Sequence, residues 1–214
     1  MKNIFYDFYG YNEQLFLIIH KFTNGQLQPA LLIISDLFEF YNFTFNFVIA
    51  SAFLAMKIKC APKTQQQQRF ELYFEKLFEI GVIYCLFILV FTLSKYSFNF
   101  QRPLCGIIDI STPIAIETIR CTSSFPSAHA VMSLFIAYCL WPYLSLVGAR
   151  IFAGVIIVIT GIARMSLALH FPADIFYGYL IAVICILAGR KLARSLPDMF
   201  KNICRNLCLY IIGR

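Results

Sequence analysis

The chain has 214 residues, of which 60% are hydrophobic and only 14% are charged, and its mean hydropathy is +0.73. A soluble globule of this size needs more polar surface than this composition provides, so the sequence predicts an integral membrane protein. The formal net charge of +7 does not indicate a nucleic-acid partner, because the basic residues gather in short segments and form no stripe or groove.

The first forty residues predict short helices at the membrane interface. In the opening MKNIFYDFYGYNEQ, Asp7, Asn12 and Glu13 interrupt the apolar residues, so no signal peptide is expected and insertion should depend on internal spans. Two apolar stretches in residues 13–39 are split by Lys21, Asn24, Gly25 and Gln26. We expect two amphipathic pieces that are interfacial or partly re-entrant, with a sixth span as the alternative.

Five later segments are apolar enough to be membrane spans: residues 41–56, 80–94, 128–140, 151–169 and 173–188. The expected fold is therefore all-α, a polytopic bundle of five to six transmembrane helices with interfacial N-terminal helices. We expect one domain over 1–214, with interfacial or re-entrant helices in 1–40, a transmembrane catalytic core in 41–194 and a cytoplasmic amphipathic tail in 195–214.

The orientation of the spans follows from lysine and arginine. Most of the basic residues fall on one side of a five-span arrangement: Lys57, Lys59, Lys63, Arg69 and Lys76 in a polar linker, Arg150 between the third and fourth spans, and Arg190, Lys191, Arg194, Lys201, Arg205 and Arg214 in the tail. That side should be cytoplasmic, with the opposite side facing the periplasm or outside of a bacterial inner membrane. In the tail, the apolar residues Phe200, Ile203, Leu207 and Ile211 recur at helical spacing, which fits an amphipathic helix on the inner leaflet or an ordinary solvated tail.

Ionisable residues gather at span ends on the non-cytoplasmic side: Lys95, Arg102, His129, Arg164, His170 and Asp174. Each has a simple structural explanation, such as snorkelling, headgroup contact or helix capping. A charged side chain at membrane depth costs free energy, so six of them on one face favour a shared functional site over six separate structural roles. His20, the third histidine, has apolar neighbours and fits an interfacial helix.

The spacing of these residues favours an anion site. In KYSFNFQRP, Lys95 and Arg102 are seven residues apart, two turns along one helix face before Pro103 ends the helix. In FPSAHAV, Ser127 and His129 stand at a helix start, where free backbone N–H groups favour a bound anion such as phosphate.

A third motif, RMSLALHFPAD, contains a candidate nucleophile. Asp174 follows His170 by four residues, so its carboxylate can accept an imidazole N–H and fix the tautomer. The opposite ring nitrogen is then free to attack. Arg164, six residues before the histidine, adds a cation.

These three motifs, K-x6-R-P, P-S-A-H and R-x5-H-x3-D in this order on consecutive helices, resemble the signature motifs of the type 2 phosphatidic acid phosphatase (PAP2) superfamily. The resemblance implies that His170 forms a phosphohistidine, that Asp174 orients it and that His129 protonates the leaving oxygen. It also implies a set of phosphate-binding residues: Lys95, Arg102, Ser127 and Arg164. No divalent metal or other cofactor is expected.

Two positions depart from the family pattern. Ala128 stands where family members usually carry glycine, and Ala163 where they usually carry serine. The first adds a methyl group near the phosphate, and the second removes one potential phosphate contact.

Between the first two motifs, Cys105 and Cys121 lie on the expected external face, where an oxidising periplasm would allow a disulfide. The other cysteines fit as small apolar residues.

The expected function is hydrolysis of a lipid phosphate or diphosphate, and the expected partners are this substrate and membrane lipids, with no nucleic acid. The family suggests an undecaprenyl diphosphate, lipid A, phosphatidylglycerol phosphate or phosphatidic acid as the substrate. Two alternatives remain open: a lipid-to-lipid phosphotransferase with the same site, and a proton-coupled membrane transporter. A transporter predicts ionisable groups distributed through the spans, whereas here they gather at one face.

Overall fold

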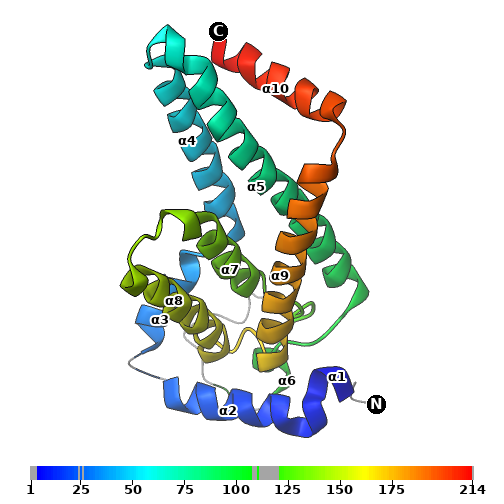
Figure 1. The fold of residues 1–214 in the computed structure, drawn as a ribbon. Coiled ribbons are helices and arrows are strands. Elements are labelled where there is room, and N and C mark those ends of the chain that lie inside the picture. Colours follow the sequence, from blue (N-terminus) through cyan, green and yellow to red (C-terminus); the bar gives the residue numbers. More distant parts are fainter. Residues whose placement is uncertain (1–3, 24, 26, 108–109, 111–120, 214) are drawn as a thin grey trace. The chain divides into compact units, whose positions relative to one another are not determined.

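The computed structural model describes residues 4–23, 25, 27–107, 110 and 121–213, so Asn24, Gln26 and Arg214 lie outside this part. The described residues form helices and no strand (Figure 1). In chain order these are α1 (Ile4–Asp7), α2 (Tyr11–Thr23), α3 (Gln28–Asp36), α4 (Phe40–Lys59), α5 (Lys63–Ser97), α6 (Pro103–Gly106), α7 (Ala128–Leu140), α8 (Val147–Ser166), α9 (Pro172–Ser195) and α10 (Asp198–Gly213).

The all-α membrane fold is confirmed. Among the described residues, four helices are long and apolar enough to cross a membrane, namely α4, α5, α8 and α9, and α7 lies in a shorter apolar stretch. Their outer faces expose large apolar side chains, as a lipid-facing surface does. Examples are Phe45, Ile49 and Phe53 on α4 and Ile151, Phe152, Val155 and Val158 on α8. The total of five or six spans stays a prediction.

The predicted polar linker 57–76 is wrong for most of its length. Helix α5 already begins at Lys63 and runs for 35 residues, about 50 Å at 1.5 Å per residue, well beyond the ~30 Å of the hydrocarbon layer. Its glutamines and charged residues are good helix formers, and side chains one turn apart are bonded, such as Gln67 to Glu71 at 2.9 Å. Arg150 also lies within a helix, α8, and not in the connection before it.

Residues 13–39 form two separate helices, as expected. Helix α2 has 13 residues and α3 has 9, so they are about 20 Å and 14 Å long, and neither crosses ~30 Å of hydrocarbon alone. Their burial differs from a purely interfacial placement, because Phe16 is fully buried and His20 is only 6% exposed. The two rings are stacked with centroids 5.5 Å apart. The N-terminal helices are therefore packed parts of the fold.

The helices pack as two units, the first made of Met1–Asn42 and Leu89–Val183. Helix α8 packs against α2, α3 and α7 in this unit, and Figure 1 shows α2 and α3 in blue beside it. A core cluster joins α2, α6, α7, α8 and α9 through buried apolar side chains: Phe16, Leu104, Ala130, Met165, Ala168 and Ile175. All the predicted site residues belong to this unit.

The second unit consists of Phe43–Ile88 and Ile184–Arg214. The tail forms a helix, α10, which is one of the two alternatives that its sequence left open. Two cysteines of this helix pack against a buried cluster of Ile58, Phe70 and Phe74. Arg205 of the same helix forms ion pairs with Glu71 at 3.2 Å and Glu75 at 3.6 Å. The location of this helix on the inner leaflet and the division into residues 1–40, 41–194 and 195–214 stay predictions.

Candidate active site

The third motif places a histidine and an aspartate together at the start of α9. His170 lies in the turn between α8 and α9, and its side chain is 3% exposed, while that of Asp174 is fully buried. The distance from His170 Nδ1 to Asp174 Oδ2 is 3.5 Å, longer than a good N–H···O hydrogen bond. Catalytic hydrogen bonds are often long in ligand-free structures and shorten when substrate binds.

Asp174 combines this role with capping of α9. Its Oδ2 accepts the backbone N–H of Phe171 at 2.8 Å, the residue before Pro172 begins the helix. One carboxylate therefore both caps the helix and faces the histidine. Its other oxygen, Oδ1, accepts hydrogen bonds from the hydroxyl groups of Tyr6 at 2.8 Å and Ser124 at 3.4 Å.

Arg164 is buried in the last turn of α8. One terminal nitrogen donates a hydrogen bond to the hydroxyl of Ser35 at 2.6 Å, which ties α8 to α3. The Nε–H of Arg164 is also buried, and it has no hydrogen-bond partner within the described residues. The guanidinium is thus held from one side while a second donor remains unsatisfied.

The expected helix carrying both Lys95 and Arg102 is not formed. Helix α5 ends at Ser97, and Arg102 is extended (φ −74°, ψ 149°), directly before α6. The extended backbone at Arg102 fits its place before Pro103, because a residue before proline disfavours the helical conformation. The two side chains reach the site from different backbone segments.

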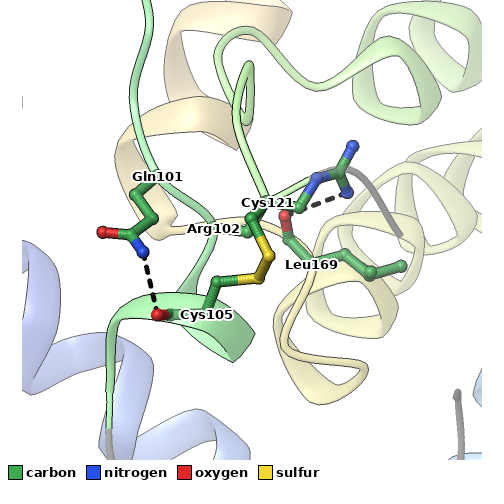
Figure 2. Close-up of a disulfide and its surroundings, with 5 residues drawn as sticks. All are labelled: Gln101, Arg102, Cys105, Cys121 and Leu169. Atoms are coloured by element: carbon green, nitrogen blue, oxygen red, sulfur yellow. Dashed lines mark hydrogen bonds between the residues drawn. A yellow bond between two sulfur atoms is a disulfide. The ribbon is translucent and has the colours of Figure 1, made fainter. Parts of the chain in front are cut away.

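A disulfide lies beside Arg102. The sulfurs of Cys105 and Cys121 are 2.06 Å apart, and Figure 2 shows the bond with its neighbours. The backbone N–H of Arg102 donates to the carbonyl oxygen of Cys121 at 2.9 Å, and its guanidinium donates to the carbonyl oxygen of Leu169 at 3.4 Å. The disulfide loop and the turn before His170 therefore both position Arg102, whose Nε–H is buried and has no partner within the described part of the chain.

Lys95 comes from the last turn of α5. Its Nζ donates hydrogen bonds to the carbonyl oxygens of Ser123 and, at 3.3 Å, Ser124. These residues directly precede the second motif, so the lysine links the end of α5 to the segment that enters α7. Ser124 also donates to Asp174, which connects all three motifs.

Ser127 is the N-cap residue of α7, as the sequence predicts, and His129 lies in the first turn. The N–H of Ser127 is not free, because it donates to the carbonyl oxygen of Asp174 at 3.1 Å. Its hydroxyl oxygen is fully buried and has no hydrogen-bond partner in the part of the chain that the structure describes. The side chain, and not its own backbone amide, is the group available to a ligand.

Several of the predicted site residues act electrostatically on the imidazole of His170. The pKa of His170 lies well below the ordinary histidine value, mainly because burial disfavours the charged ring. Nearby positive groups lower it further: Arg164, Arg102, Lys95 and His129. The imidazole is therefore neutral near pH 7, the form in which a ring nitrogen has a lone pair for attack.

Four polar contacts at this site have no counterpart among the residues that the motifs predict. Ser35 binds Arg164, Tyr6 and Ser124 bind Asp174, and Asn12 accepts the N–H of Ala173 at 2.8 Å. Only Ser124 carries a local signal, because it is next to the FPSAH motif. The others lie far from the motifs in the chain, so no local pattern marks them.

No group of three or more His, Cys, Asp or Glu side chains suited to a metal ion occurs among the described residues. The charged groups at the site are mostly cations, which suit an anion. The chemistry that this arrangement allows is nucleophilic attack by a neutral imidazole on a group with oxyanions.

Comparison with known proteins identifies the family. The PAP2 superfamily matches residues 76–196, which is more than half of the chain and includes all three motifs. The chain belongs to the PAP2 superfamily. No curated protein sequence matches it at a significant level.

Two solved structures resemble this chain in fold. The crystal structure of LpxE from Aquifex aeolicus has a TM-score of 0.63 at 21% identity, over 83% of this chain and 93% of the other. The first transmembrane PAP2 type phosphatidylglycerolphosphate phosphatase from Bacillus subtilis has a TM-score of 0.53 at 19% identity, over 87% and 96%. These similarities support a PAP2 membrane fold for nearly the whole chain.

Proposed function

We propose that this protein is a membrane phosphatase that hydrolyses a lipid phosphate or lipid diphosphate through a phosphohistidine on His170. The observation that carries the proposal is a set of buried donors from the motif residues: Arg102 Nε, Arg164 Nε and Ser127 Oγ have no partner within the described residues. A buried unsatisfied donor costs about 1–3 kcal/mol. The oxygens of a phosphoryl group would satisfy all three beside a neutral imidazole.

The first chemical step transfers the phosphoryl group to the enzyme. Asp174 holds the Nδ1–H of His170, and the lone pair on Nε2 attacks phosphorus while the bond to the lipid oxygen breaks. His129 donates its proton to that oxygen, so the lipid leaves as an alcohol or, from a diphosphate, as a monophosphate. Lys95, Arg102 and Arg164 stabilise the negative charge on the phosphoryl oxygens.

The second step regenerates the enzyme. A water molecule attacks phosphorus, gives a proton to His129 and displaces His170, and inorganic phosphate leaves. The scheme needs no metal ion, because the cationic side chains supply the charge stabilisation.

The substrate carries its phosphate at the headgroup level and keeps its tail in lipid. An undecaprenyl diphosphate, lipid A, phosphatidylglycerol phosphate and phosphatidic acid all meet this description. The distribution of lysine and arginine supports a site that faces the periplasm of a bacterial inner membrane, since most basic residues belong to the opposite side. The orientation is tested with Lys63→Cys in a variant that has no other reactive cysteine. Reaction of this cysteine with a membrane-impermeant reagent in sealed cells would contradict the orientation.

The proposal is tested with protein purified in detergent, a panel of these four lipids, and a chelator with no added metal. Phosphate release is compared between wild type, His170→Gln and His129→Ala, with folding monitored by size-exclusion chromatography. We expect His170→Gln to lose at least about 10³-fold in kcat, because the nucleophile is missing. Undiminished phosphate release by a folded His170→Gln protein would refute the nucleophile assignment.

A second experiment looks for the intermediate. A substrate with a good leaving group does not need protonation, so His129→Ala should still form the phosphohistidine and then hydrolyse it slowly. Mass spectrometry under alkaline conditions should find one phosphoryl group on the peptide that contains His170. Labelled phosphate that appears on a second lipid instead of in solution would identify the phosphotransferase alternative.

A further inference from the structure

The N-terminal helix α1 contributes a side chain to the buried dyad. The hydroxyl of Tyr6 donates a hydrogen bond to Asp174 Oδ1 at 2.8 Å, although 168 residues separate the two in the chain. The tyrosine hydroxyl also lies 3.4 Å from the hydroxyl of Ser124, which binds the same carboxylate oxygen. Tyr6 therefore contacts the group that faces the proposed nucleophile and not the nucleophile itself.

The contacts of Asp174 are divided between its two oxygens. Oδ2 accepts the N–H of Phe171 and faces His170 Nδ1, while Oδ1 accepts Tyr6 and Ser124. Donors on both oxygens fix the plane of the carboxylate. Without the bond to Tyr6, rotation about the last side-chain torsion would move Oδ2 relative to the imidazole, because this torsion has a broad energy profile in aspartate.

Tyr6 is itself held firmly. Its ring is stacked on Phe100 with a centroid distance of 3.9 Å and makes edge contacts with Phe125 and Phe171. Burial and the neighbouring Asp174 raise the pKa of Tyr6 above its ordinary value, so the hydroxyl keeps its proton. The group is a neutral donor in a fixed position.

The segment that carries Tyr6 is attached to the beginning of α9 by two more hydrogen bonds. Asn12 accepts the N–H of Ala173 at 2.8 Å, which satisfies a free amide in the first turn of the helix. The hydroxyl of Tyr177 donates to the carbonyl oxygen of Phe5 at 2.6 Å. These contacts place α1 against the turn that carries the dyad, beyond any role at the membrane interface.

We propose that Tyr6 is a positioning residue for the reaction: it orients Asp174, and through Asp174 the imidazole of His170. The inference rests on the proposed function, because it assigns a role within that same site. In the absence of Tyr6 the substrate still meets every phosphate-binding side chain, so the chemical step is affected and binding is not.

The test is the substitution Tyr6→Phe, which removes the hydroxyl and keeps the ring stack. We expect kcat to fall about tenfold, the effect of losing a hydrogen bond to a charged group, with KM unchanged. Tyr9→Phe is the matched control, because Tyr9 lies on the same segment and is 82% exposed, and it should retain wild-type activity. Tyr177→Phe tests only the attachment of α1 to α9. It should lower the melting temperature, and it should reduce kcat less than Tyr6→Phe does.

A double-mutant cycle with Asp174→Asn separates positioning from general stability. If Tyr6 acts through Asp174, Tyr6→Phe should have little further effect on kcat in the Asp174→Asn background. Equal fold losses in both backgrounds, or a kcat for Tyr6→Phe equal to that of Tyr9→Phe, would overturn the inference while leaving the phosphatase proposal intact. Failure of the phosphatase proposal would instead appear as wild-type protein that releases no phosphate from any lipid of the panel, and failure of the nucleophile assignment as full activity in His170→Gln.

Discussion

Ser127 and Asp174 are joined directly, through a hydrogen bond of 3.1 Å from the N–H of the serine to the carbonyl oxygen of the aspartate. The bond connects the start of α7, which carries His129, to the start of α9, which Asp174 caps. The proposed acid and nucleophile are therefore held by backbone contacts as well as by their own side chains. Their relative position depends on how closely the two helices approach.

Gly178 allows this close approach, and Gly178→Ala should reduce activity. A Cβ atom at Gly178 would lie 3.0 Å from the carbonyl oxygen of Ser127 and 3.2 Å from Ala130 Cβ, so α7 would have to move. A small displacement at a catalytic site is costly, and we expect about a tenfold lower kcat. The control is Gly154→Ala on α8, where no atom lies within 4 Å, and it should preserve activity and stability. Equal behaviour of the two variants in phosphate-release and melting assays would contradict this account.

Arg164 should not be replaceable by lysine. Its guanidinium already uses one nitrogen on Ser35, and a lysine ammonium has no rigid second donor to reach a phosphoryl oxygen at the same time. We expect Arg164→Lys to lower kcat/KM by about 10²-fold to 10³-fold, measured as initial rates of phosphate release. Ser35→Ala should cost much less, because the charge remains. A fully active lysine variant would show that the second donor has no role.

The disulfide should stabilise both the fold and Arg102. We expect Cys105→Ser with Cys121→Ser to lower the free energy of unfolding by about 3 kcal/mol, the loop-closure value for this separation. Activity should also fall, because the bond from Arg102 to the carbonyl oxygen of Cys121 loses its support. Cys60→Ser, at an exposed free cysteine, is the control for thermal unfolding in detergent. Unlinked peptides in non-reducing mass spectrometry would contradict the pairing.

Stability should fall as the pH is lowered, partly because of His170. Its pKa in the folded protein is below the ordinary value of about 6.5, so the unfolded chain binds a proton where the folded protein does not. The contribution is therefore complete above about pH 6.5 and is lost as the pH falls towards the folded pKa, at up to about 1.4 kcal/mol per pH unit. The melting temperature should therefore drop more between neutral and acidic pH for wild type than for His170→Gln. The same pH dependence in both proteins would show that His170 is not buried in its neutral form.

Much of the fold could be predicted from local patterns. The apolar segments predict α4, α8 and α9 and the later part of α5, since the hydrocarbon layer requires about 20 apolar residues per span. The early part of α5 was missed, because polar residues with high helix propensity resemble a linker when only hydropathy is considered. The periodicity of the tail left a helix and a solvated tail as alternatives, and the structure has the helix, α10.

The sequence by itself determined that this protein belongs in a membrane, and it supplied the candidate residues for its chemistry. The spacing of His170 and Asp174 places them together within a single turn, because four residues are one turn of a helix. The order and spacing of the three motifs were also sufficient to indicate the PAP2 superfamily.

Only the tertiary structure decided how the motifs meet and what supports them. It placed Arg102 on extended backbone beside a disulfide, Ser35 against Arg164, and Tyr6 against Asp174. These contacts join residues that are far apart in the chain, and a hydrogen bond between distant residues leaves no periodicity or spacing in either segment. They arise when the helices pack, because each buried donor then needs a partner from whichever segment lies beside it.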